Sequence, residues 1–152
     1  GPHENYWDRR TSAAVGLYTG RVADQVHPYV RPQESGYKTD VRWVALTNRE
    51  GYGLLAVGVP LISASATPYL PADYEPLRGP GQRRMSDMTP RDFVVFNVDD
   101  RQMGVGGDTS WGAKTHPEYT LPAQPYAYRF RLRPYSSRDA DPAALARQVF
   151  AP

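Results

Sequence analysis

The 152-residue sequence has no cysteine, which excludes disulfide bonds and thiolate-ligated metal sites and fits a reducing cytoplasm better than the periplasm. No apolar run approaches the roughly 18 residues that a membrane-spanning helix needs. An excess of one charge is also lacking, because 18 basic residues face 16 acidic ones and the formal net charge is +2. Such a balance does not form the basic surface that binds nucleic acid. We therefore expect neither a membrane nor a nucleic-acid partner.

Patterns that bind metals or nucleotides are missing as well. The three histidines, His3, His27 and His116, share no ligand spacing such as His-x-x-x-His. The glycine-rich run at 104–107 has the wrong spacing for a dinucleotide fingerprint, and no helix pattern follows it. We predict that this segment by itself holds no metal ion and no cofactor.

The sequence is instead rich in residues that interrupt regular structure. Its 15 prolines and 13 glycines divide it into short segments, which is typical of an all-β protein built as an antiparallel β-sandwich. Residues 41–47 and 53–62 predict two strands, and the turn signal between them predicts a hairpin. Further strands are expected at 14–22 and 92–99. Residues 66–90 contain five prolines and predict a surface excursion with one helical turn at 73–75.

Residues 125–134 show the clearest period of two in the chain. The positions on one face are aromatic or apolar: Tyr126, Tyr128, Phe130 and Leu132. Those on the opposite face are mostly arginines: Ala127, Arg129, Arg131 and Arg133. We expect the aromatic face to point inward and the cationic face to point to solvent. A short helix is expected further on, with Asp141 as its N-cap and Pro142 at its first position.

Residues 102–112, with the sequence QMGVGGDTSWG, combine a dense glycine run with a tryptophan. Glycine at this density indicates a backbone that takes positive φ or that another group approaches closely, so Gly104, Gly106 and Gly107 are expected to shape a turn. Asp108 is expected to anchor this turn through backbone N–H groups. Two interpretations of Trp111 remain open: a core residue that follows a β-bulge, or a flat ring on a stiff turn that stacks on a sugar.

Three segments in a fixed order resemble a known family, the large bacterial β-galactosidases of glycoside hydrolase family 2. Residues 102–112 resemble its Met-Gly-x-Gly-Gly-Asp-x-Ser-Trp signature. Residues 1–9, GPHENYWDR, resemble its Gly-Pro-x-Glu-Asn-Tyr-x-Asp-Arg motif, and residues 28–36, PYVRPQESG, resemble its Pro-Tyr-x-x-Pro-x-Glu-Asn-Gly motif. Trp7 and Thr109 depart from the family pattern, in which proline and a second aspartate are frequent.

The resemblance implies that residues 1–134 are the C-terminal part of the family's last domain, a sandwich resembling galactose mutarotase, and that 135–152 form a tail with a short helix. In the family, two catalytic glutamates and the magnesium and sodium sites lie on an upstream (β/α)₈ barrel. This sequence matches none of those motifs, so we assign no catalytic residue here. By resemblance, Trp111 enters the barrel's active site as a platform for the aglycone or for glucose, in a homo-oligomeric enzyme that hydrolyses terminal β-D-galactose from lactose-like substrates with retention.

Two other functions stay open: a stand-alone carbohydrate-binding module, and an assembly domain such as the small subunit of a two-chain enzyme. Glu4 and Glu34 are expected to make structural hydrogen bonds. We expect the isolated segment to be inactive. As half of a larger sandwich, it is also expected to leave an apolar face at 126–132 uncovered and to self-associate, unless the chain repacks.

Overall fold

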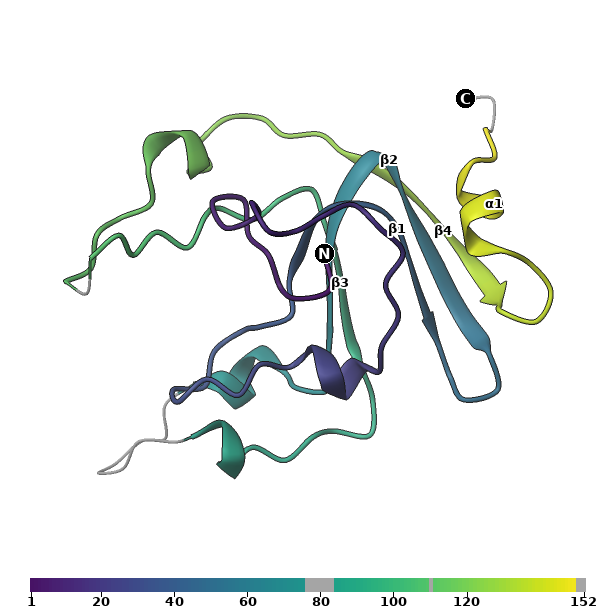
Figure 1. Ribbon diagram of the computed structural model, residues 1–152, viewed down its shortest axis with the longest axis horizontal. Helices are drawn as coiled ribbons and strands as arrows, with labels where there is room; N and C mark the ends of the chain where they lie inside the picture. The colour runs from purple at the N-terminus through teal and green to yellow at the C-terminus, as the bar shows by residue number, and fades with distance from the viewer. Residues whose placement is uncertain (76–83, 110, 150–152) are drawn as a thin grey trace.

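The computed structural model describes residues 1–75, 84–109 and 111–149. In this part of the chain, four antiparallel strands form one sheet, accompanied by four short 3₁₀ helices and one α-helix (Figure 1). The all-β, antiparallel class predicted from the sequence is confirmed. None of the helices among the described residues has the length and apolar content needed to cross a membrane.

The elements follow one another along the chain in short pieces. The strands are β1 (Lys38–Thr47), β2 (Tyr52–Thr67), β3 (Val95–Asp99) and β4 (Arg129–Ser136). The helices are η1 (Val22–Gln25), η2 (Pro71–Tyr74), η3 (Met85–Asp87), η4 (Pro117–Tyr119) and α1 (Pro142–Ala146). The predicted hairpin is confirmed as β1 and β2. In its turn, the side-chain oxygen of Asn48 accepts hydrogen bonds from the N–H groups of Glu50 and Tyr52, both at 3.0 Å.

Strand β2 is the centre of the sheet. It pairs with β1 along one edge, while β4 and then β3 share its other edge. Between Val41 and Trp43, two steps along β1 correspond to five steps along β2, from Ile62 to Val57. Extra residues of this kind form a bulge that bends the strand. The bend separates the β4 half of the sheet from the β3 half, and these halves point in different directions (Figure 1).

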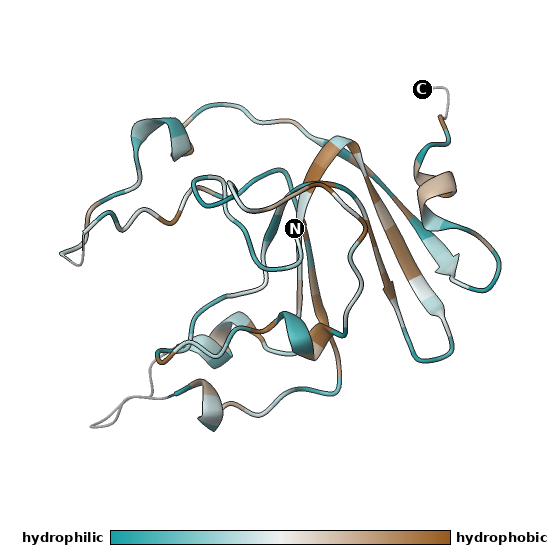
Figure 2. Ribbon diagram, in the orientation of Figure 1, coloured by the Kyte–Doolittle hydropathy of each residue, from teal (hydrophilic) through white to brown (hydrophobic). Residues whose placement is uncertain are grey.

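The first core cluster lies between the sheet and α1. Its buried members are Leu55, Val57 and Tyr135, and Trp43, Ala45, Leu145 and Ala146 pack against them. The most hydrophobic ribbon lies along β1 and β2 (Figure 2). Both ends of α1 are fixed by polar groups. Asp141 caps the start by accepting the N–H groups of Ala143 and Ala144 at 3.1 Å, as predicted. At the other end, Arg131 donates to the carbonyl oxygens of Ala146 and Gln148, at 2.7 and 2.6 Å.

A second core cluster lies within the predicted surface excursion. Tyr69, Met85 and Met88 are buried there, and Val26 and Tyr74 pack against them. The helical turn expected at 73–75 is present as η2, one to two residues earlier. Residues 76–83 of the excursion lie outside the described residues. The prediction of a surface excursion was wrong for Tyr69, Met85 and Met88, which are buried. Flexible methionine side chains suit the filling of such an irregular core.

The strand expected at 14–22 was also wrong. The structure shows no strand there, and the apolar side chains Val15 and Leu17 are largely exposed. Apolar alternation favours a strand only where a neighbouring strand can take up its backbone hydrogen bonds. No described strand pairs with residues 14–22, so this part of the chain is irregular until η1 begins.

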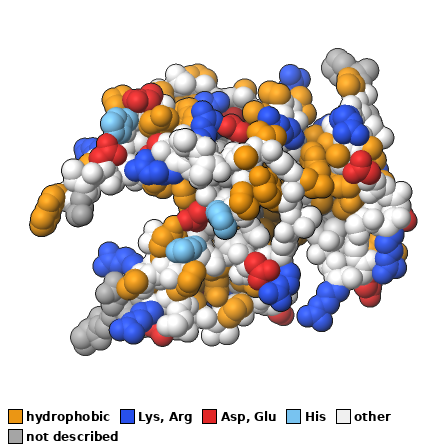
Figure 3. Space-filling view, in the orientation of Figure 1, with side chains coloured by type: hydrophobic (Ala, Val, Ile, Leu, Met, Phe, Trp, Pro, Cys, Tyr) orange, Lys and Arg blue, Asp and Glu red, His pale blue; other side chains and the backbone are white. Residues whose placement is uncertain are grey.

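The strand predicted at 125–134 is present as β4 from Arg129 onward, and the prediction of an inward aromatic face was wrong, whereas Arg129 and Arg133 of the cationic face are exposed as expected. Tyr126, Tyr128, Phe130 and Leu132 are 39–53% exposed, whereas Arg131 lies under the end of α1. A period of two fixes which side chains share a face, but not which face is covered. The expectation of an uncovered apolar face at 126–132 is confirmed. Hydrophobic side chains gather over β1, β2 and β4 in Figure 3. Self-association stays a prediction.

The two faces of the sheet predict different costs for the same substitution. Leu55→Ala should lower the free energy of unfolding by about 2–5 kcal/mol, because Leu55 is fully buried and its truncation leaves a cavity. Leu132→Ala, on the uncovered face, should change it by only about 0.5 kcal/mol. Urea unfolding of the two variants measures both values. Equal losses would show that the Leu132 face is packed in solution.

Candidate functional site

Glu4, in the first motif, joins that motif to the second. Its Oε2 accepts a hydrogen bond from the N–H of Gly36 at 2.8 Å, and its Oε1 accepts one from the hydroxyl of Tyr29. The bond to Glu4, together with burial, raises the pKa of Tyr29 to about 12, so the phenol keeps its proton through the neutral range. The structural role expected for Glu4 is confirmed. Glu34 is exposed, and its side chain makes no hydrogen bond to another described residue, so the same expectation stays a prediction for it.

Asn5 and Tyr6 extend this junction to β1. The side-chain oxygen of Asn5 accepts hydrogen bonds from the N–H and the hydroxyl of Thr39, at 2.9 and 2.6 Å. The N–H of Asn5 donates to the carbonyl of Tyr37 at 2.8 Å, and the Tyr6 ring stacks parallel to the Tyr37 ring with centroids 5.8 Å apart. The first motif is therefore fixed to the sheet before it reaches the glycine loop.

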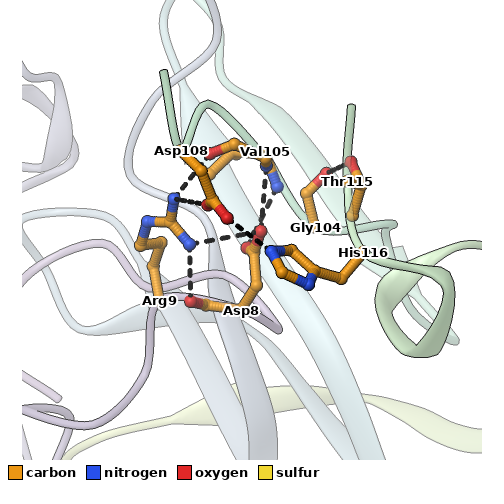
Figure 4. A network of polar contacts seen from close by, with 8 residues as sticks. Asp8, Arg9, Gly104, Val105, Asp108, Thr115 and His116 are labelled. Carbon is orange, nitrogen blue, oxygen red and sulfur yellow. Dashed lines mark hydrogen bonds and ion pairs between the residues drawn. The ribbon is translucent and has the colours of Figure 1, made fainter. Parts of the chain in front are cut away.

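Asp8 anchors the glycine loop (Figure 4). Its side chain is only 3% exposed and accepts the N–H groups of Val105 and Gly106 at 3.0 and 2.9 Å. Burial alone would raise the pKa of Asp8, but these backbone hydrogen bonds and the charge of Arg9 outweigh it, and the pKa lies below its ordinary value. A Cβ at Gly104 would lie 2.5 Å from the carboxyl carbon of Asp8, so glycine is required there for close approach.

The loop is closed on itself by backbone and hydroxyl contacts. The hydroxyl of Thr115 donates to the carbonyl of Gly104 at 3.0 Å, and the N–H of Gly107 donates to the carbonyl of Ala113 at 3.1 Å. Gly106 and Gly107 have φ values of 65° and 80°. A Cβ at Gly106 would also lie 2.8 Å from the N of Thr115. Both reasons for dense glycine, positive φ and close approach, therefore occur in this loop.

Asp108 makes contacts that differ from those expected. The backbone N–H groups of Val105 and Gly106 bond to Asp8, whereas the carboxylate of Asp108 contacts two side chains. Its Oδ2 lies 2.5 Å from Nε2 of His116, and its Oδ1 lies 3.8 Å from Nη2 of Arg9. Arg9 also donates to the carbonyl of Gly106 at 2.5 Å. Sequence reasoning did not identify Asp8, Arg9 or His116 as part of this site.

Trp7, at the position where the family pattern has proline, contacts residues on either side of the loop. The guanidinium of Arg101 lies 5.5 Å from the centre of the Trp7 ring, and the ring meets Tyr119 edge to face at 6.0 Å. The N–H of Gly104 donates to the carbonyl of Tyr119 at 2.8 Å. The base of the loop is therefore held from the N-terminal segment and from η4 at the same time.

Trp111 lies beyond these anchors and is 94% exposed. Its backbone N–H donates to the hydroxyl of Thr109 at 3.3 Å. Ser110, between the two residues, lies outside the described residues. The interpretation as a core residue was wrong, because neither core cluster of the described residues covers the ring. The loop extends away from the sheet (Figure 1). What the arrangement offers chemically is a flat, polarisable surface on a fixed base.

Acid–base and metal chemistry find little support in this loop. Among the described residues, no group of three or more histidine or acidic side chains is placed to hold a metal ion. The prediction that the segment holds no metal stays a prediction. Asp8 is engaged by backbone N–H groups, and Asp108 by Arg9 and His116, so neither carboxylate is poised as a general acid.

Asp8→Asn should lower the free energy of unfolding by about 1–3 kcal/mol at neutral pH. The carboxylate of Asp8 accepts two backbone N–H groups, those of Val105 and Gly106, whereas an amide has one oxygen to accept and places its NH₂ group against the other N–H. A lowered pKa gives stability that is complete above the ordinary value of 3.8 and is lost as pH falls through the folded-state pKa. The difference between wild type and variant should therefore shrink below that value. Denaturant unfolding across this range checks it, with the exposed Asp139→Asn as control. A difference that does not depend on pH would contradict the charged anchor.

Comparison with known proteins places this chain in a family. Residues 1–132 match the family model described as the β-galactosidase small chain. The β-galactosidase of Priestia megaterium is 49% identical over 135 residues, which are 88% of this chain and 13% of the relative. Those of Halalkalibacterium halodurans and Lactobacillus delbrueckii subsp. bulgaricus are 40% and 37% identical over 124 residues each, covering 81% and 82% of this chain and 12% of each relative. The chain therefore spans a small part of the length of these relatives, and it belongs to the β-galactosidase small-chain family.

Proposed function

We propose that this chain is the non-catalytic C-terminal domain of a retaining β-galactosidase of glycoside hydrolase family 2, and that Trp111 gives the whole enzyme's active site an aromatic platform. The relatives named above are β-galactosidases, and the chain spans only 12–13% of their length. The proposal assigns the catalytic carboxylates and the magnesium and sodium ions to a barrel elsewhere in a homo-oligomeric, cytoplasmic bacterial enzyme.

The exposure of Trp111 carries the proposal. The ring of Trp111 is 94% exposed. Such an apolar area in contact with water is unfavourable, and it indicates a surface that another group covers. The ring extends from a loop whose base is fixed by Asp8, so docking it elsewhere costs little ordering of the loop. A flat, rigid ring binds through area and CH–π contact, which suits aglycones of varied hydroxyl pattern.

An assembly role is the second candidate, and the uncovered face of β4 favours it. Tyr126, Tyr128, Phe130 and Leu132 form an apolar row without a covering element among the described residues. A barrel-bearing partner chain could bury that row, as the family's name suggests. The two candidates are compatible. Co-purification of this chain with a separate barrel chain would support the second, whereas measurable sugar affinity of this chain alone would favour a carbohydrate-binding module.

Substitution of the ring in the full-length enzyme tests the platform. Trp111→Ala should raise KM for lactose and the inhibition constant for glucose about 3- to 10-fold, with the galactose constant unchanged, because only the stacking contact is removed. If ground and transition states use the ring equally, kcat changes little. Trp111→Phe should keep part of the effect. Val149→Ala, at an equally exposed position, is the matched control. Unchanged KM and glucose inhibition would contradict the platform.

The isolated chain should hydrolyse no β-galactoside. Retaining glycosidases need two carboxyl groups about 5–5.5 Å apart around the scissile bond, and we place both outside this segment. The purified chain is assayed with a chromogenic β-galactoside beside the full-length protein. Activity that co-elutes with the 17.0 kDa species in size-exclusion chromatography would refute this prediction.

A further inference from the structure

We propose that Arg9 and His116 are positioning residues for Trp111, which hold the carboxylate of Asp108 between them and make the placement of the ring depend on pH. We call these three side chains the latch. The inference rests on the proposed role of Trp111 and adds to it how that ring is held in place.

The latch lies closer to the ring than the anchor does. Asp8 holds the loop at Val105 and Gly106, whereas Asp108 is only three residues before Trp111. Nε2 of His116 lies 2.5 Å from one carboxylate oxygen of Asp108, on the limb of the loop that returns from Trp111. The latch therefore ties the limb that enters the exposed tip to the limb that leaves it (Figure 4).

Arg9 holds the same carboxylate from outside the loop. Its Nη2 lies 3.8 Å from Oδ1 of Asp108 and 2.5 Å from the carbonyl oxygen of Gly106, and its Nη1 lies 3.4 Å from Asp8. One guanidinium thus connects the anchor to the latch. A shift of Asp108 relative to Arg9 moves the start of the tip, and with it the ring.

The latch differs from the anchor in its exposure, and hence in what it controls. The side chains of Asp108 and His116 are 48% and 52% exposed, whereas that of Asp8 is almost fully buried. Ion pairs in contact with solvent add little to the stability of a fold. Because the anchor already fixes the base of the loop, we expect the latch to affect where the tip lies and to leave the free energy of unfolding nearly unchanged.

The charge on His116 sets the strength of the latch. The hydrogen bond to Asp108 and the attraction of its charge raise the pKa of His116, Glu118 in η4 adds to this rise, and Arg9 opposes it. A raised pKa means that the interaction is complete below the ordinary value of 6.5 and weakens as pH rises through the folded-state pKa. The ring should therefore be held most firmly on the acidic side of neutrality.

The experiment uses the full-length enzyme and follows the ratio of the inhibition constants for glucose and galactose from about pH 6 to about pH 9, a range that brackets histidine titration. Taking the ratio cancels pH effects that change both inhibition constants alike, and the galactose constant by itself reports any pH effect on the galactose subsite. In wild type the ratio should rise about two- to fivefold across this range, the size of a solvent-exposed ion pair.

Two variants of His116 separate positioning from a purely structural role. His116→Gln should show the high-pH ratio at every pH, because its amide cannot gain a charge. His116→Arg should restore the low-pH ratio at every pH, because its guanidinium stays charged. His3→Gln, at an exposed histidine outside the site, should keep the wild-type profile.

The outcomes distinguish this inference from the proposed function. If Trp111→Ala weakens glucose binding but the wild-type ratio is flat with pH, or the His116 variants follow the wild-type profile, the latch is overturned and the platform stands. If Trp111→Ala leaves glucose inhibition unchanged, both are overturned. A pH-dependent ratio that is lost in His116→Gln and fixed at its low-pH value in His116→Arg supports the latch.

Discussion

The buried carboxylate of Asp8 accepts hydrogen bonds from a backbone 97 residues further along the chain, and the candidate site depends on this contact. An ionised group removed from water is costly unless its oxygen atoms are satisfied. Here the N–H groups of Val105 and Gly106 satisfy them, and Arg9 supplies a compensating charge. The same contact explains Gly104, since a side chain there would occupy the space of the carboxyl group. The N-terminal motif and the glycine loop are thus one structural unit.

The β4 half of the sheet is covered by its own chain on one face only, whereas in the β3 half both faces of β2 are covered, since Ile62, Ser63, Ala64 and Ser65 are all buried. Helix α1 packs over Leu55, Val57 and Tyr135, whereas the row from Tyr126 to Leu132 stays open to solvent. A chain packed in this way has a core sufficient for a defined fold, and the open face of its β4 half is a surface for burial against more protein. That asymmetry suits a segment that spans 12–13% of the length of the relatives named above.

The features that the sequence predicts correctly are those set by nearby residues. The hairpin follows from alternation and turn chemistry, and the start of α1 follows from Asp141 and Pro142. The alternation along β4 was predicted correctly, but the aromatic face was wrongly expected to be the buried one. Which face is buried depends on where α1 packs, and α1 lies on the arginine side. The strand expected at 14–22 failed for a related reason, because a strand requires a neighbour that local pattern does not supply.

The site shows the same division. The residues of the glycine loop were visible as a motif, whereas the chemistry that holds the loop comes from distant positions. Asp8 and Arg9 lie in another motif, and only the fold brings them to the loop. His116 has no recognisable spacing to any ligand or partner, and its relation to Asp108 becomes evident only when the two limbs of the loop lie side by side. The exposure of Trp111 likewise depends on the length and path of those limbs, which the local sequence does not specify.

The energetics of a single exposed ring decide between the functions considered for this chain. Stacking on one aromatic face adds about 0.5–1.5 kcal/mol beyond area burial, which corresponds to roughly a tenfold change in affinity or less. One ring with solvent on its other sides cannot retain a sugar at useful concentrations, and the loop adds no free carboxylate that would hold hydroxyl groups. As a stand-alone carbohydrate-binding module, the loop would be too weak. The same increment matters at the edge of a pocket whose other walls bind galactose, because there it adds to an affinity that already exists. This weighs against the stand-alone module and supports the proposed composite site, in which this chain would supply an apolar wall and another part of the enzyme the rest.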